Sequence, residues 1–211
     1  GQGKTLKYGL PLTYAWEEPT KCVLNYYQIN HCPMIGISWG GYFVMRAAAF
    51  EKRISAVVAY DVADDGLEIM TNVFPPILRR LIRWVFAHKQ EKLVNHLVRF
   101  AIHKSVLADW ALSQGQYITH TKSPYRFYQE VQKHTLRGVC DRITQDCLLL
   151  AGEKDHYIPI DQFERLQSSL PNARSVKKCV FTQAEGGEQH CQIGNHQLAL
   201  NEITQWLEGL E

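Results

Sequence analysis

The sequence predicts an α/β protein in which a parallel sheet carries helices on both faces, with one helical segment inserted. Two observations support this prediction. Short and almost wholly apolar runs, at residues 54–60 and 147–152, alternate with stretches of helical periodicity, and strands buried on both faces of a parallel sheet have this composition. A Gly-x-Ser-x-Gly sequence, from Gly36 to Gly40, lies between another apolar run and a run of helix formers.

Length and composition restrict the class of protein. The 211 residues, of which 45% are hydrophobic, are enough for one buried core with an appended lid. A net charge of +2 is too small to indicate nucleic acid as a partner. The sequence contains no run of about 18 apolar residues, no signal peptide and no lipidation motif, so we expect no membrane span. The six cysteines show no Cys-x-x-Cys spacing, which favours reduced thiols in a cytoplasmic protein.

The first part of the chain, up to the end of the second predicted strand, contains the Gly-x-Ser-x-Gly sequence. Acidic residues followed by proline, as at residues 17–19, are typical of a helix start. The expected elements are a loop at 1–3, a helix at 19–27, a buried strand at 34–37, a helix that includes 45–49, and a strand at 54–60.

Residues 67–140 differ in pattern from the flanking segments, and we expect them to form an inserted helical lid. Apolar residues recur at helical spacing over 77–85 and over 93–101, while Lys and Arg occupy the opposite positions together with three histidines. We interpret the basic face as solvated, although a helix pair that binds a membrane surface or an anionic partner has the same pattern. The lid would separate a first core part, residues 1–66, from a second core part, residues 141–211.

The alternation of strand and helix resumes after residue 140. The first helix of this part is expected to have Asp161 as its N-cap, because a short polar side chain there can accept a hydrogen bond from the first turn. The expected elements are a strand at 147–152, a helix at 161–170, a strand at 176–181, a loop at 186–190 and an amphipathic helix at 195–210.

Strand, sharp turn and helix are the context in which Gly-x-Ser-x-Gly forms a nucleophile elbow. We expect the turn to hold Ser38 in strained backbone angles, with Gly36 and Gly40 keeping side chains out of the crowded turn. The backbone N–H of Trp39 would contribute to an oxyanion hole, helped by the positive end of the helix that begins there. A glycine-rich turn without chemistry is the alternative interpretation.

A serine becomes a strong nucleophile when a base accepts its proton, and the base needs an acid that fixes its tautomer. In open parallel sheets such groups lie at the carboxyl ends of strands. Ser38 follows the first predicted strand, Asp155 follows the strand at 147–152, and His190 follows the strand at 176–181 by one loop. The chain order serine, aspartate, histidine is that of α/β-hydrolases. We therefore predict Ser38 as nucleophile, Asp155 as acid and His190 as base.

Other residues compete for the roles of acid and base. Asp61, at the end of the strand that follows the nucleophile, is a second candidate acid, and Glu153 is a weaker one. His196 is expected inside the final helix, and His156 follows Asp155 too closely to reach the serine from another loop.

Cys191 adjoins His190, which raises the question of a metal site. The sequence shows no second ligand at a usable spacing, so we predict neither a metal nor a cofactor.

Four segments are distinctive in combination. They are residues 35–42 (Ile-Gly-Ile-Ser-Trp-Gly-Gly-Tyr), 46–54 (Arg-Ala-Ala-Ala-Phe-Glu-Lys-Arg-Ile), 59–61 (Ala-Tyr-Asp) and 185–192 (Glu-Gly-Gly-Glu-Gln-His-Cys-Gln). Together they resemble α/β-hydrolases of the 2,6-dihydroxypseudooxynicotine hydrolase group, which includes fungal polyketide-shortening hydrolases of naphthol-melanin pathways. Fermentation–respiration switch-like esterases are similar more loosely. Because residues 1–3, 9–11 and 16–17 also match, the resemblance covers nearly the whole chain.

The resemblance implies a cofactor-independent serine hydrolase with an α/β-hydrolase fold, the triad Ser38, Asp155 and His190, and a helical lid. Its relatives include esterases and enzymes that cleave a carbon–carbon bond next to a ketone by retro-Claisen chemistry. The implied partner is a small carbonyl compound, aromatic or polyketide-like, and the sequence leaves room for a homodimer. The rival interpretation is a non-catalytic protein of this fold that binds a ligand or partner through its basic lid.

The chain departs from the family pattern at its beginning. Family members carry a helical N-terminal region and about four more strands upstream, and one of those upstream loops supplies the second oxyanion donor. We therefore expect an N-terminally truncated chain with an open sheet edge beside residues 34–37. Losing one oxyanion donor typically lowers turnover about a hundredfold to a thousandfold, so low activity is expected of the chain alone.

Overall fold

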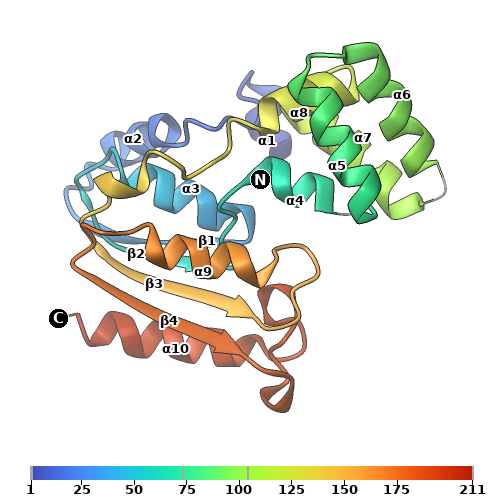
Figure 1. The fold of residues 1–211 in the computed structure, drawn as a ribbon. Helices are drawn as coiled ribbons and strands as arrows, with labels where there is room; N and C mark the ends of the chain where they lie inside the picture. The colour runs from blue at the N-terminus through green and yellow to red at the C-terminus, as the bar shows by residue number, and fades with distance from the viewer. Residues whose placement is uncertain (1, 73, 104, 211) are drawn as a thin grey trace. The chain divides into compact units, whose positions relative to one another are not determined.

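The computed structural model describes residues 2–72, 74–103 and 105–210. Two compact units divide these residues, and each is described by itself (Figure 1). The helical unit consists of the chain up to Tyr14 together with Gly66–His134. The core unit consists of Ala15–Asp65 together with the chain from Thr135 onward.

The core unit contains a four-stranded sheet in which every pair of neighbouring strands is parallel. Its strands follow the chain order, and in Figure 1 the arrowheads of β3 and β4 point the same way. The predicted strands are confirmed, with β2 matching its predicted bounds. The strands are β1 (Cys32–Ile37), β2 (Ile54–Tyr60), β3 (Asp146–Gly152) and β4 (Ser175–Phe181).

Helices cover both faces of this sheet, as predicted. Figure 1 shows α2 (Glu17–Tyr26), α3 (Trp39–Ala48) and α9 (Ile160–Ser168) on one face and α10 (His196–Glu208) on the other. Apolar side chains fill the layer between the sheet and α10, and they exclude water from the strands that carry the site. They include Val58, Leu148, Leu150, Ile203 and Trp206.

The burial expected for β1 is wrong. Ile35 is 48% exposed and Ile37 is 57% exposed. Among the described residues β1 pairs only with β2, so its other edge is open, which confirms the open edge expected there. An apolar composition shows that a strand suits burial, but a neighbouring strand and a covering helix are needed to bury it.

Two further expectations in the core and helical units need correction. Pro159, not Asp161, is the N-cap of α9, and Asp161 lies in the first turn, where it pairs with Arg165 at 2.7 Å. A carboxylate in the first turn still favours the helix through its dipole. Residues 2 and 3, expected in a loop, belong to α1 (Gln2–Lys7), whose Leu6 is buried, while Gly1 lies outside the described residues.

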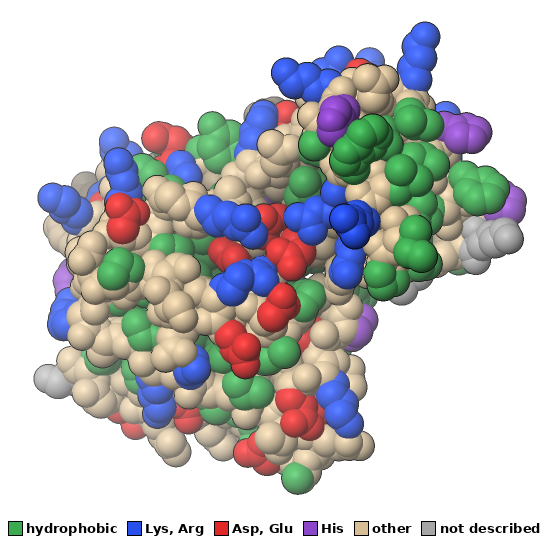
Figure 2. Space-filling view, in the orientation of Figure 1, with side chains coloured by type: hydrophobic (Ala, Val, Ile, Leu, Met, Phe, Trp, Pro, Cys, Tyr) green, Lys and Arg blue, Asp and Glu red, His purple; other side chains and the backbone are tan. Residues whose placement is uncertain are grey.

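The helical unit confirms the two amphipathic helices. They are α5 (Pro76–Ala87) and α6 (Glu91–Ile102), which bury Ile82, Val85, Val94 and Val98. Figure 2 shows exposed basic and hydrophobic side chains together over this unit, in the upper right of the view. None of the described helices has the length and apolar character needed to cross a membrane. The remaining helices are α4 (Gly66–Asn72), α7 (Val106–Thr119) and α8 (Pro124–Val131).

Candidate active site

Ser38 lies in a strained turn between β1 and α3, as predicted. Its backbone angles are φ 58° and ψ −122°, a left-handed conformation that is uncommon outside glycine. The Ser38 N–H donates to the Tyr60 carbonyl at 2.7 Å, and the Gly41 N–H donates to the Ser38 carbonyl at 2.8 Å. These two backbone hydrogen bonds hold the turn from the strand side and from the helix side.

Of the two glycines expected to keep side chains out of this turn, the structure confirms Gly36 but not Gly40. A Cβ on Gly36 would lie 2.0 Å from the Gly40 carbonyl oxygen, so only glycine fits at residue 36. A Cβ on Gly40 would meet nothing within 4 Å, so crowding does not require glycine there. The second crowded position is Gly41, where a Cβ would lie 3.0 Å from the Val62 Cα. The motif did not reveal this, because the close neighbour, Val62, lies two residues beyond the end of β2.

His190 lies in the turn that follows β4, and its ring contacts the other two predicted residues. Its Nε2 is 2.8 Å from the Ser38 Oγ, and its Nδ1 is 2.6 Å from the Asp155 Oδ2. Asp155 follows β3, and its Oδ1 accepts hydrogen bonds from the backbone N–H groups of Tyr157 and Ile158 at 2.7 and 2.9 Å. The His190 and Asp155 side chains are only 11% and 3% exposed. The structure therefore brings Ser38, His190 and Asp155 into one hydrogen-bonded series.

The competing residues are placed differently. Asp61 Oδ2 is 3.7 Å from His190 Nδ1, beyond hydrogen-bond distance, and it accepts the backbone N–H of Cys191 instead. Glu153 is exposed and accepts the Gln183 N–H at 2.8 Å. His196 is the first residue of α10, and its Nδ1 lies 2.9 Å from the Cys191 carbonyl oxygen.

Electrostatics around His190 favour its protonated form. Burial opposes the imidazolium charge, but the hydrogen bond with Asp155, the neighbouring Cys191 side chain and the Asp155 charge together raise the pKa of His190 to about 10. Burial raises the pKa of Asp61 to about 6, against the Cys191 N–H that favours its charged form. The site can therefore hold a proton on the imidazole after it is taken from a hydroxyl.

Trp39 is the first residue of α3 and directly follows Ser38. Its backbone N–H belongs to the first helical turn, where N–H groups point away from the helix and the helix dipole is positive. The structure thus places the Trp39 N–H in the residue next to Ser38, at the start of α3. The sequence offered no residue for a second donor.

One group of possible metal ligands also lies at this site. The ligand atoms of Asp61, His190 and Cys191 lie within 4.8 Å of one another. Sequence spacing did not suggest Asp61 as a possible metal ligand, because it is 130 residues from Cys191. Both ring nitrogens of His190 already contact Ser38 and Asp155, so a metal would have to displace one of them. The positions of these side chains are therefore better explained by the hydrogen bonds of His190 than by a metal site.

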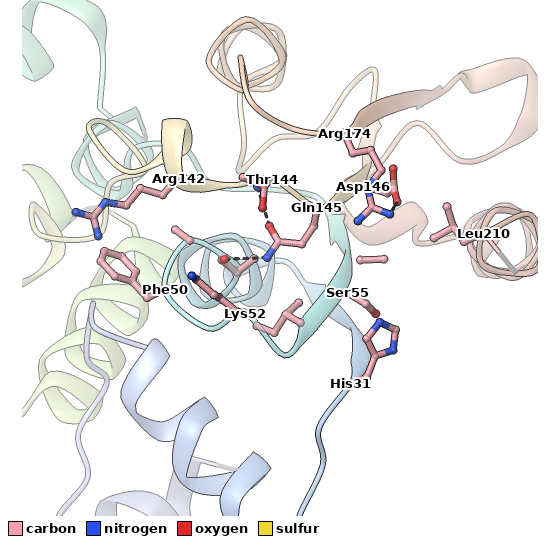
Figure 3. Close-up of a pocket in the computed structure, with 14 residues that line it drawn as sticks. His31, Phe50, Lys52, Ser55, Arg142, Thr144, Gln145, Asp146, Arg174 and Leu210 are labelled. Carbon is pink, nitrogen blue, oxygen red and sulfur yellow. Dashed lines mark hydrogen bonds and ion pairs between the residues drawn. The ribbon is translucent and has the colours of Figure 1, made fainter.

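A cavity of about 730 Å³ lies elsewhere in the core unit (Figure 3). Residues 54–56 and Asp146, at the amino ends of β2 and β3, form part of its wall. Arg142 and Arg174 line it too, and Arg174 is paired with Asp146 at 3.2 Å. Because Ser38, Asp155 and His190 lie at the carboxyl ends of the strands, this cavity is separate from their site.

Comparison with known proteins gives the family. A family model described as alpha/beta hydrolase fold matches residues 13–186. The chain is 26% identical over 231 residues to the hydrolyase ccsE of Aspergillus clavatus, which covers 99% of this chain and 52% of that protein. It is 23% identical over 222 residues to the hydrolase acrC of Aspergillus aculeatus, covering 99% of this chain and 51% of that protein. The chain thus spans about half the length of the curated relatives it matches.

Solved structures show the same fold. The 2,6-dihydroxy-pseudo-oxynicotine hydrolase superposes with a TM-score of 0.64 at 15% identity, over 97% of this chain and 48% of that one. A meta-cleavage product hydrolase from Pseudomonas fluorescens IP01 superposes with a TM-score of 0.61 at 15% identity, over 96% of this chain and 74% of that one. At these identities the likeness establishes the arrangement of strands and helices.

Proposed function

Because the chain belongs to the alpha/beta hydrolase fold family, we propose that it carries the active site of a serine hydrolase that attacks a carbonyl group. Ser38 is the nucleophile, His190 the base, Asp155 the acid, and the Trp39 N–H an oxyanion donor. The observation that carries this proposal is the series Ser38 Oγ, His190 and Asp155, with contacts of 2.8 and 2.6 Å between groups from three different strand ends. The family, its fold and the hydrolase relatives support it.

In the proposed reaction a proton moves from Ser38 to His190 and then from His190 to the leaving group. His190 Nε2 accepts the Ser38 hydroxyl proton as Oγ attacks the carbonyl carbon, and Asp155 stabilises the imidazolium. The oxyanion forms beside the first turn of α3, where the Trp39 N–H donates to it. The carbonyl re-forms, the leaving group departs and takes the proton from His190, and water then hydrolyses the acyl-serine by the same route. The leaving group is an alcohol in an ester, or a carbanion equivalent when a bond next to a ketone breaks.

The proposed substrate is a small carbonyl compound of aromatic or polyketide-like character. This class is carried by the resemblance of the sequence to the 2,6-dihydroxypseudooxynicotine hydrolase and fungal polyketide-shortening group, and the structural likeness to the 2,6-dihydroxy-pseudo-oxynicotine hydrolase supports it. A role in secondary metabolism, such as melanin formation, follows from the same resemblance. We propose that residues 67–140 act as a lid that selects the substrate, between core parts 1–66 and 141–211.

A second candidate function is ligand or partner binding without catalysis. The observation in its favour is the exposed basic surface of the helical unit, which includes Arg80, Arg83, Lys92 and Arg99. Binding makes no demand on a hydrogen-bonded serine, histidine and aspartate, so their contacts favour the hydrolase.

Fluorophosphonate labelling, read by intact mass and peptide mapping, tests the proposal. We expect labelling of Ser38 alone in the chain, and in any longer protein that contains it, with loss of labelling in His190→Ala. Ser113→Ala and His103→Ala are matched controls, because both side chains are exposed in the helical unit, and they should label normally. If a longer protein that contains this chain is folded and Ser38 still stays unlabelled, the binding function is supported instead.

A further inference from the structure

Two consecutive residues at the end of β2 hold both polar groups of the Cys191 backbone. The Tyr60 hydroxyl donates to the Cys191 carbonyl oxygen at 2.9 Å. The Cys191 N–H donates to the Asp61 carboxylate. Tyr60 is 4% exposed and Asp61 is 1% exposed, so water cannot replace these contacts easily. We call these two residues the β2 clamp.

The backbone that the β2 clamp holds is strained. Cys191 has φ 52° and Gln192 has φ 47°, left-handed values that cost energy for residues other than glycine. Such a conformation persists only where surrounding contacts fix it. Asp61 is itself left-handed, with φ 58°, and its N–H donates to the Leu150 carbonyl of β3 at 3.0 Å. The clamp is thus anchored in the sheet.

The β2 clamp contacts the backbone on both sides of the proposed proton transfer, at Ser38 and beside His190. The Tyr60 carbonyl accepts the Ser38 N–H at 2.7 Å, while the Tyr60 hydroxyl holds the residue that follows His190. One residue therefore fixes the backbone of the nucleophile and the backbone beside the base. A displacement of about 1 Å between reacting groups can lower a rate about a hundredfold.

We propose that Tyr60 and Asp61 are positioning residues that keep His190 in line with Ser38 by fixing the Cys191 backbone. The inference rests on the proposed hydrolase function. Asp61 acts here as a hydrogen-bond acceptor for the Cys191 N–H, and its charge is not required for the role. This distinguishes it from an acid of the triad, which must stabilise the imidazolium with its charge.

The Asp61 variants test this distinction. Asp61→Asn keeps an oxygen that can accept the Cys191 N–H, whereas Asp61→Leu has a similar size and no acceptor. We expect the Asn variant to label at Ser38 within about threefold of the wild-type rate, and the Leu variant to label about tenfold to a hundredfold more slowly. Equal losses in Asn and Leu would show that the charge matters and would overturn the positioning role.

Tyr60→Phe removes only the clamp hydroxyl and keeps the ring and the Ser38 hydrogen bond to the backbone. We expect a fall of about tenfold in labelling rate, and in kcat with an unchanged KM once a substrate is known. Tyr26→Phe is the matched control, because Tyr26 is 80% exposed, and it should match wild type.

Thermal unfolding and circular dichroism of each variant show whether it is folded. If Asp61→Leu does not fold, Tyr60→Phe and Asp61→Asn still decide the question. Wild-type protein that never labels at Ser38 contradicts the hydrolase function itself. Normal labelling in wild type, Tyr60→Phe and Asp61→Leu alike leaves the hydrolase standing and overturns the β2 clamp.

Discussion

Gly152, the last residue of β3, lies so close to Glu188 that a Cβ at residue 152 would be 2.4 Å from the Glu188 carbonyl oxygen. The same carbonyl accepts the Lys154 N–H at 2.8 Å. The end of β3 and the loop that carries His190 are therefore in direct backbone contact. This contact brings Asp155, three residues after Gly152, within reach of the imidazole.

Gly152→Ala should disturb the site as well as the fold. The added methyl group must push the 188–189 backbone away, which typically costs about 1–3 kcal/mol of folding free energy. We expect a lower thermal midpoint and a labelling rate at Ser38 that falls by more than tenfold. Gly40→Ala is the matched control, since a Cβ there meets nothing within 4 Å, and it should label faster than Gly152→Ala.

The pH dependence of the reaction should follow the raised pKa of His190. The base is active only when neutral, and a raised pKa keeps it protonated to higher pH. We therefore expect the acid limb of the labelling rate to lie above pH 6.5, the ordinary histidine value, and the rate to rise with pH through it. Labelling rates from pH 5 to about 10.5 measure this.

Asp155→Asn is the control for that profile. It removes the carboxylate that holds the charge on His190, so the acid limb should shift to lower pH, and turnover should fall about 10⁴-fold. An acid limb that does not move when Asp155 loses its charge would contradict the assignment of Asp155 as the partner of His190.

Ser38→Gly should remove the nucleophile and stabilise the protein. Glycine adopts φ 58° without the cost that a side chain pays there, so we expect a gain of about 1 kcal/mol in unfolding free energy. Ser38→Ala keeps the strain and serves as the comparison. Chemical denaturation of both variants measures the difference, and equal stabilities would mean that the turn stores no strain at Ser38.

The open edge of β1 should make the chain prone to association. Ile35 and Ile37 are both about half exposed on β1, which among the described residues pairs only with β2 and so forms an edge of the sheet. Replacing Ile37 with Lys should lower light scattering of concentrated protein, because a charge on an edge strand opposes pairing with another chain. Val23→Lys, on an exposed helix position, is the control for added charge alone. Equal scattering in both variants would show that the edge is not the associating surface.

Several features of this chain could be predicted from the sequence because they depend on residues that are close together along the chain. The bounds of β2, the amphipathic helices of the helical unit and the left-handed Ser38 all follow from local composition and from one short motif. Ser38, Asp155 and His190 could be singled out because each follows a predicted strand, and strand ends of a parallel sheet meet at one edge.

The errors have a common physical origin. The composition of β1 fits a buried strand, but its exposure depends on whether another element covers it. Gly40 looked essential from the motif, whereas the crowding falls on Gly41, whose neighbour Val62 comes from a distant part of the chain. In both cases the deciding contact is made across space.

The sequence by itself determined the alternation of strands and helices, the elbow at Ser38 and a short set of candidate acids and bases. Only the tertiary structure decided that Asp155, at 2.6 Å, rather than Asp61, at 3.7 Å, contacts His190, and that Tyr60 holds the Cys191 backbone 131 residues away. Periodicity and motifs report interactions within a few residues, whereas tenths of an ångström between loops are set by the packing of the whole core unit.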